Sequence, residues 1–322
     1  MAAAETRPAR SGWQRARPVL VLVLLGATGW ALAQQAPAMA RALATTQVRW
    51  GWIAAATAVV LATYALLIQG WRLLLGGWGG ELRYADAVRI WTIANLGRWI
   101  PGKVWSVGAL GVLAAEQGVS GLAAAGAALL GTALNLGAGC AIAVLFGARA
   151  LESLNPAWRW LAWGAAAAFV AIVLALPRML PALLGNIARR RGVPLEQQHL
   201  PTSTLWLVTV MQGVAWVGYG AAFWMFARGA TPAVSGNPWQ FVALFSASYL
   251  AGYLVLIAPG GVGVREGVLT ALLVAMGLAS TGDAVLLGVL SRGWLTVLEI
   301  IPGLISLALH PRRARSALRP SG

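Results

Sequence analysis

The feature that most restricts the fold of this chain is a series of long apolar stretches with few charged residues. A helix that crosses the hydrocarbon core of a bilayer needs roughly 20 apolar residues. Only 10% of the 322 residues are charged, against about 25% in soluble domains, so most of the chain cannot face water. We therefore predict an all-α polytopic membrane protein. Six stretches are long and continuous enough to cross: 18–34, 52–71, 119–147, 158–177, 205–227 and 284–309.

Two further apolar stretches are interrupted near the middle by proline and glycine. Residues 88–115 contain the sequence RWIPGK, and residues 240–280 contain APGGVGVRE. A proline removes a helical hydrogen bond and clashes with the preceding turn, so each helix has to break at this point. The backbone groups that the break frees cannot face lipid. Each break is therefore expected to be buried in protein or to line a wet cavity.

The first apolar stretch has two interpretations. Basic residues precede it and its apolar core ends in Ala31, Leu32 and Ala33, an Ala-x-Ala pattern that also occurs at the cleavage site of signal peptides. We expect the stretch to be retained as an uncleaved first helix, because the repeat described below requires it.

The basic residues are distributed unevenly along the chain. Of the 24 Lys and Arg residues, 17 fall in segments that would share one side of the membrane and five fall in the loops opposite. The other two, Arg265 and Arg292, lie within membrane segments. Because cytoplasmic loops are enriched in Lys and Arg, we predict that both termini, 1–17 and 310–322, are cytoplasmic, in a bacterial inner membrane. The net charge of +15 then requires no nucleic-acid partner.

The two interrupted stretches suggest an internal repeat. Pro101 and Gly102 align with Pro259 and Gly260 at an offset of 158 residues, and the chain divides into repeats at 18–147 and 148–309. Each half then has three spans and one broken segment. Three crossings is an odd number, so the second half is inverted, as in many secondary transporters. We predict that both broken segments are re-entrant; the alternative is eight simple spans.

Charged residues concentrate at the breaks and in the last span. A charge at the bilayer centre costs about 2.5–3.5 kcal/mol on insertion scales, so such residues are expected to be paired or functional. We expect Glu266 to pair with Arg292, and Arg265 to face Glu299 or an anionic ligand. The alternative is that these charges only hold helices together, with the basic residues of the first break acting as interfacial anchors. The residues concerned are Arg98, Lys103, Arg265, Glu266, Arg292 and Glu299.

The breaks are also suited to binding an anion. A helix that restarts after a break presents free N–H groups and the positive end of its dipole, and glycines allow the backbone to approach a ligand closely. We predict cavity ion pairs made by Glu266, Arg292 and Glu299. The predicted substrate-binding residues are Arg98, Pro101, Gly102, Lys103, Pro259, Gly260, Gly261, Gly263 and Arg265.

Several chemistries lack the residues they require. One cysteine and two histidines cannot form a His/Cys metal site. No Walker-type phosphate loop is present, and the nine acidic residues form no close cluster for a catalytic base or metal. We therefore expect no cofactor, no metal and no enzymatic activity.

Two motifs make the chain resemble the lysylphosphatidylglycerol synthase transmembrane, or flippase-like, family: NLGRWIPGKVWSVG and APGGVGVREG. The resemblance covers about 18–310. Some members carry an aminoacyl transferase that adds lysine to phosphatidylglycerol before the product is flipped. The present chain ends about a dozen residues after its last span, so we expect a stand-alone member without that transferase. The resemblance leaves the cargo open among phospholipids, polyprenyl-linked sugars and hopanoids.

The sequence thus predicts a protein that moves an amphipathic, anionic lipid between leaflets. Two other functions stay open at this point. One is a membrane-embedded transferase for lipid-linked substrates, and the other is a non-transporting partner in envelope lipid assembly. Association with a second copy or with an envelope-biogenesis protein is also left open.

Overall fold

The computed structural model describes residues 47–99, 105–152, 200–255 and 261–309, together with a few single positions elsewhere. All regular structure in these ranges is helical, which confirms the predicted all-α class. The first and fourth predicted spans, 18–34 and 158–177, fall outside the continuously described ranges.

Four helices are long and apolar enough to cross a membrane. Each agrees with a predicted span to within a few residues at the start, because the length of an uncharged apolar run decides where such a helix can lie. The helices are α2 (Trp50–Gly76), α5 (Gly121–Glu152), α7 (Thr202–Ala230) and α10 (Thr281–Ala308).

The two interrupted stretches form pairs of shorter helices. The first contains α3 (Tyr84–Asn95), the 3-10 helix η1 (Leu96–Trp99) and α4 (Trp105–Ala115). The second contains α8 (Pro238–Leu254) and α9 (Val264–Ala275). These α-helices have 11 to 17 residues, fewer than the roughly 20 needed to cross a bilayer.

Each pair of short helices folds back on itself as a hairpin. In the second hairpin, the N–H of Ser235 before α8 donates to the carbonyl of Leu278 after α9 at 3.0 Å, which closes the base. At its tip, a Cβ placed on Gly252 of α8 would lie 2.9 Å from the Cβ of Arg265 in α9. In the first hairpin, a Cβ on Gly97 would lie 3.1 Å from the backbone nitrogen of Ser106. In each hairpin the backbone therefore reverses direction between the two helices.

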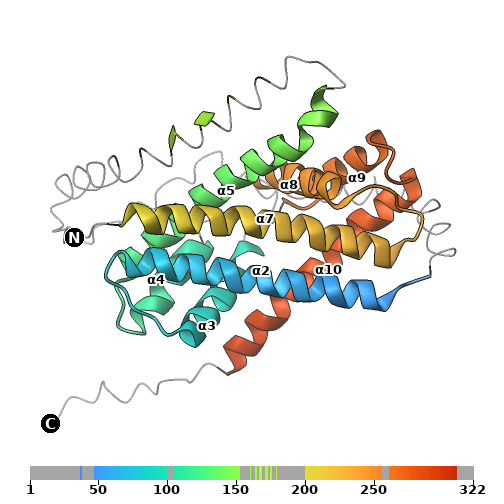
Figure 1. The fold of residues 1–322 in the computed structure, drawn as a ribbon. Coiled ribbons are helices and arrows are strands. Elements are labelled where there is room, and N and C mark those ends of the chain that lie inside the picture. The colour runs from blue at the N-terminus through green and yellow to red at the C-terminus, as the bar shows by residue number, and fades with distance from the viewer. Residues whose placement is uncertain are drawn as a thin grey trace, which may run out of the picture.

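The long helices α2 and α7 lie side by side and run in opposite directions (Figure 1). The N–H of Arg49, before α2, donates to the carbonyl of Gly229 near the end of α7 at 2.8 Å. At the other end, Gly77 after α2 lies against Leu200 before α7. Since each hairpin follows the C-terminal end of one of these helices, the two hairpins enter the bundle from opposite ends.

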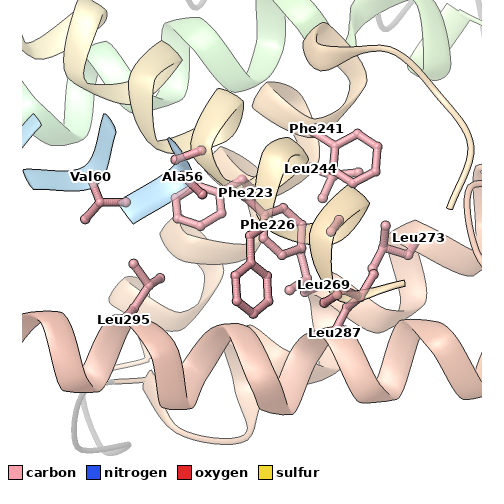
Figure 2. Close-up of a cluster of buried hydrophobic side chains, with 14 of the residues drawn as sticks. Ala56, Val60, Phe223, Phe226, Phe241, Leu244, Leu269, Leu273, Leu287 and Leu295 are labelled. Atoms are coloured by element: carbon pink, nitrogen blue, oxygen red, sulfur yellow. The ribbon is translucent and has the colours of Figure 1, made fainter. Parts of the chain in front are cut away.

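Two hydrophobic clusters surround the hairpins, and α2 and α7 contribute to both. Figure 2 shows the cluster of the second hairpin, where Phe223 and Phe226 of α7 meet Leu269 of α9 and Leu287 of α10. Helices in lipid associate through close packing more than through water exclusion. Gly220 of α7 provides such packing, because a Cβ there would lie only 2.3 Å from the Cα of Val242 in α8.

Candidate functional site

A cavity of about 240 Å³ lies where the tips of the two hairpins approach each other. The first hairpin contributes Asn95, Arg98 and Ser106 to its wall, and the second contributes Gly261 and Arg265. The cavity is therefore built by the two breaks, which lie far apart in the sequence, together with the sides of the long helices.

Arg98 is held at the cavity by two hydrogen bonds. It lies in η1, where the short 3-10 turn continues α3 toward the break. Its Nη1 donates to Oε1 of Glu299 in α10 at 2.7 Å, and its Nη2 donates to the hydroxyl of Tyr249 in α8. Arg98 is therefore fixed by one carboxylate and one phenol from two different helices.

Arg265 has a different environment, although it faces the same cavity. Its side chain is only 5% exposed, and its guanidinium carbon lies 5.0 Å from the ring centroid of Phe245 and 5.2 Å from that of Tyr249. Its Nη2 has no hydrogen-bond partner in the described part of the chain. We expected Arg265 to face either Glu299 or a ligand, but the ion pair of Glu299 is with Arg98. Sequence spacing could not reveal this, because Arg98 comes from the other half.

Glu266 stabilises the start of α9. Its Oε2 accepts a hydrogen bond from the N–H of Gly263 at 2.7 Å, and its Oε1 lies 3.7 Å from Nε of Arg292 in α10. Gly263 has φ 84°, a left-handed conformation that favours glycine. The first N–H at this helix start thus binds the protein's own carboxylate, where the sequence suggested an anionic ligand.

Gly261 allows the tip of the second hairpin to close. Its φ is +71°, and a Cβ there would lie 2.8 Å from the carbonyl oxygen of Gly252. Five other predicted site residues lie outside the described residues, so their part in the site stays a prediction. They are Pro101, Gly102, Lys103, Pro259 and Gly260.

Tyrosines are among the site residues that the sequence analysis did not identify. Four of the five tyrosines line the cavity: Tyr64, Tyr219, Tyr249 and Tyr253. Tyr64 is 7% exposed, and its hydroxyl has no hydrogen-bond partner among the described residues. The positions of two of them in the sequence could have indicated this role. Tyr64 and Tyr219 fall in the middle of predicted spans, away from the membrane interfaces where tyrosine is usually enriched.

Uncharged polar side chains form another part of the wall. Nδ2 of Asn135 in α5 donates to Oε1 of Gln212 in α7 at 2.7 Å, and Nε1 of Trp216 donates to the carbonyl of Asn135 at 2.8 Å. These bonds connect α5 to α7 beside the cavity. The described residues contain no group of three or more acidic, His or Cys residues that could hold a metal.

The charges of the site favour binding of an anion. Two guanidinium groups face the cavity, and one of them is paired with a carboxylate. A guanidinium is planar, remains charged and offers several N–H groups to a phosphate or carboxylate. The arrangement can therefore bind a phosphate group inside a predominantly apolar bundle.

Comparison with known families supports the resemblance noted in the sequence. A family described as the lysylphosphatidylglycerol synthase TM region matches residues 18–303, and no other domain was found. A search of curated proteins gave no match. The matched region includes both hairpins, the long helices α2, α5 and α7, and α10 as far as residue 303. The chain is an integral multi-pass membrane protein that belongs to the lysylphosphatidylglycerol synthase transmembrane-region family.

Proposed function

We propose that this protein moves an anionic amphipathic lipid between the leaflets of a membrane, with the lipid phosphate passing through the cavity between the hairpin tips. The observation that supports this proposal most directly is the environment of Arg265. Its guanidinium is buried at the cavity and forms no ion pair within the described residues. A charge inside a bilayer costs about 2.5–3.5 kcal/mol, and a phosphate would offset that cost.

The other charged residues have supporting roles in this proposal. Arg98 provides the second cation for the phosphate, while Glu299 keeps it oriented. Glu266 and Arg292 hold the start of α9 against α10, so that Arg265 stays directed at the cavity. Lys103 belongs to the proposed site by its sequence position.

We also infer an inverted repeat, with α2 to α5 as one unit and α7 to α10 as the other, and with re-entrant hairpins. Two observations support it. The helices α2 and α7 are antiparallel. The contacts between the two units are also reciprocal. The first hairpin packs on the last helix of the second unit, through α3 and α10, and the second hairpin packs on the last helix of the first unit, through α8 and α5. In such an arrangement, either hairpin can seal one side of the cavity while the other opens.

The proposed setting is the inner membrane of a bacterium with both termini in the cytoplasm. The distribution of Lys and Arg supports this orientation. The first hairpin then enters from the cytoplasm and the second from the opposite side.

Lipid exchange between leaflets of proteoliposomes tests the function. Wild type is compared with Arg265→Ala and Arg98→Ala at equal reconstituted protein, with the exposed Arg83→Ala as the matched control. Loss of a hydrogen bond to a charged group costs about 1.5–3 kcal/mol, so we expect both cavity variants to slow exchange of anionic lipid by about tenfold or more. The control should exchange lipid like wild type.

Two results would contradict the proposal. If wild type exchanges every lipid at the rate of protein-free liposomes, the protein is not an autonomous lipid transporter. If Arg265→Ala matches wild type, lipid does not pass through this cavity.

A further inference from the structure

Some polar side chains that line the cavity have no hydrogen-bond partner among the described residues. Nη2 of Arg265 and the hydroxyl of Tyr64 are buried and have no hydrogen-bond partner among the described residues. Asn95 and Ser106 also line the cavity, and their side chains form no hydrogen bond within the described part of the chain. Buried polar groups in native proteins are nearly always bonded. Arg265 and Tyr64 therefore point to a bound ligand, and the half-buried side chains of Asn95 and Ser106 offer that ligand further polar groups.

The uncharged groups gather beside Arg98 at the first hairpin tip. Asn95 precedes Arg98 by three residues, a spacing that places side chains on one face of a helical turn. Ser106 lies across from them, because a Cβ on Gly97 would be 3.1 Å from its backbone nitrogen. A phosphate at Arg98 would therefore place the rest of the headgroup next to an amide and a hydroxyl.

Acidic side chains are absent from the described lining of the cavity. The residues that join the described parts at the two breaks, 100–104 and 256–260, also include no Asp or Glu. Glu299 and Glu266 face Arg98 and Arg292, respectively. The rings of Phe245 and Tyr249, which could bind a cation, already face Arg265. An ammonium group in the cavity would thus meet two guanidinium groups and no free carboxylate among the described residues.

We infer that the cavity selects a lipid phosphate whose headgroup is uncharged and bears hydroxyl groups, as in a glycerol or sugar phosphate, and rejects aminoacylated headgroups. This inference rests on the proposed function and adds the chemical class of the headgroup. Arg98 and Arg265 bind the phosphate, while Asn95, Ser106 and Tyr64 bond the hydroxyl groups. A site that bonds a hydroxyl disfavours an analogue that lacks it, because its polar groups are then left without a partner.

The size of the cavity is compatible with such a headgroup. Its volume of about 240 Å³ far exceeds the roughly 30 Å³ that one water occupies in the liquid. The wall also includes Trp91, whose ring lies 5.6 Å from that of Tyr64. Aromatic rings offer flat apolar surfaces to the carbon skeleton of a polyol or sugar.

The test compares lipids that share one negative charge but differ in hydroxyl groups. Proteoliposomes contain acyl-labelled phosphatidylmethanol, phosphatidylglycerol or phosphatidylinositol, and two further arms use a polyprenyl phosphoglucose and lysylphosphatidylglycerol. In wild type we expect the hydroxyl-bearing anionic lipids to exchange about three- to tenfold faster than phosphatidylmethanol, the effect of one or two neutral hydrogen bonds. Lysylphosphatidylglycerol should exchange at the protein-free rate. The polyprenyl arm distinguishes a sugar-phosphate lipid from a glycerolipid.

Variants assign the preference to the cavity. Asn95→Leu and Ser106→Ala should lower the ratio of phosphatidylglycerol to phosphatidylmethanol exchange toward one. Gln117→Leu removes an amide that does not line the cavity and should keep the wild-type ratio. Asn95→Asp adds a carboxylate at nearly constant volume, and should permit exchange of lysylphosphatidylglycerol.

Binding in detergent separates this inference from the proposed function. Thermal unfolding is followed with the short-chain lipids dihexanoyl-phosphatidylglycerol and dihexanoyl-phosphatidylmethanol. At equal concentration the first should raise the melting temperature of wild type more than the second, and Asn95→Leu should remove the difference. Equal exchange or equal stabilisation by both lipids would overturn the headgroup selection and leave the transport proposal standing. Exchange of lysylphosphatidylglycerol by wild type would overturn the rejection of cationic headgroups. If no lipid exchanges but phosphatidylglycerol stabilises the protein more than phosphatidylmethanol does, transport fails and the selective site holds.

Discussion

At the scale of single residues, Tyr249 connects the two arginines of the cavity. Its hydroxyl accepts a hydrogen bond from Arg98, and its ring lies under the guanidinium of Arg265. The ring of Trp216 packs edge-on against it at 5.4 Å. One side chain of α8 thereby contacts a cation from each hairpin.

Replacing Tyr249 by phenylalanine separates these two roles. The variant keeps the ring below Arg265 and removes the acceptor for Arg98. A hydrogen bond to a charged group contributes about 1.5–3 kcal/mol, so we expect Tyr249→Phe to lower the melting temperature in detergent and to slow lipid exchange. Tyr84→Phe is the control, because the hydroxyl of Tyr84 makes only an exposed bond to the carbonyl of Ala65. Equal melting temperatures for the two variants would argue against the role of Tyr249.

The charged residues of the site were predictable, but their partners were only partly so. A charge inside an apolar stretch is costly, which draws attention to Arg265 and Glu299 from the sequence alone. Spacing along one helix shows which residues share a face and not which helix that face meets. The bond from Arg98 to Glu299 joins elements about 200 residues apart, and it could not be read from either motif.

At the scale of the elements, the hairpin tips depend on glycines that let two backbones touch. Gly261 combines a positive φ with contact to the backbone of Gly252 in α8. The same contact region holds the Cβ of Arg265 against α8. The position of the cation therefore depends on how closely α9 starts against α8.

We expect Gly261→Ala to destabilise the hairpin. The left-handed backbone alone costs about 1–2 kcal/mol for a residue with a Cβ, and the new methyl group would lie 2.8 Å from the carbonyl oxygen of Gly252. Gly267→Ala, in the same helix, is the matched control, since a Cβ there meets nothing within 4 Å, and alanine favours the helix by roughly 0.5–1 kcal/mol. Thermal unfolding in detergent should show a lower melting temperature for the first variant and an equal or higher one for the second.

The elements were more predictable than the site. Apolar run length located the long helices, and proline with glycine located the breaks in the two stretches 88–115 and 240–280. The end of α2 was harder to predict, because this helix continues past the apolar run through Arg72 to Gly76. Arg72 is accommodated by a bond from its Nε to the carbonyl of Leu82 at 2.7 Å, a contact between separate segments that apolar run length does not reveal.

At the scale of the whole molecule, the two hairpins enter from opposite ends and their tips share one cavity. The turn between α4 and α5 then lies at one end of the bundle, and the turn between α7 and α8 lies at the other. Ser120 and Ser235 are exposed in these turns. In the proposed orientation, Ser120 faces the cytoplasm and Ser235 faces the opposite side.

Labelling of single cysteines tests this orientation. Cys140 is the only native cysteine, so Cys140→Ala gives a background to which Ser120→Cys or Ser235→Cys is added. A membrane-impermeant maleimide applied to intact cells of a host without an outer membrane barrier should label the second variant and not the first, and inverted vesicles should reverse the result. Labelling of both positions from one side would overturn the antiparallel placement of the two turns.

The contact of Tyr249 with both arginines has a thermodynamic consequence. A ligand that draws Arg98 away from the hydroxyl of Tyr249 also frees the ring of Tyr249 to move, and the guanidinium of Arg265 lies over that ring. The two cations therefore behave as one coupled unit, and substitutions of Arg98 and Arg265 should not be additive in their effect on binding. Under the proposed function, a headgroup bound to Arg98 of the first hairpin would therefore change the surroundings of Arg265 in the second hairpin.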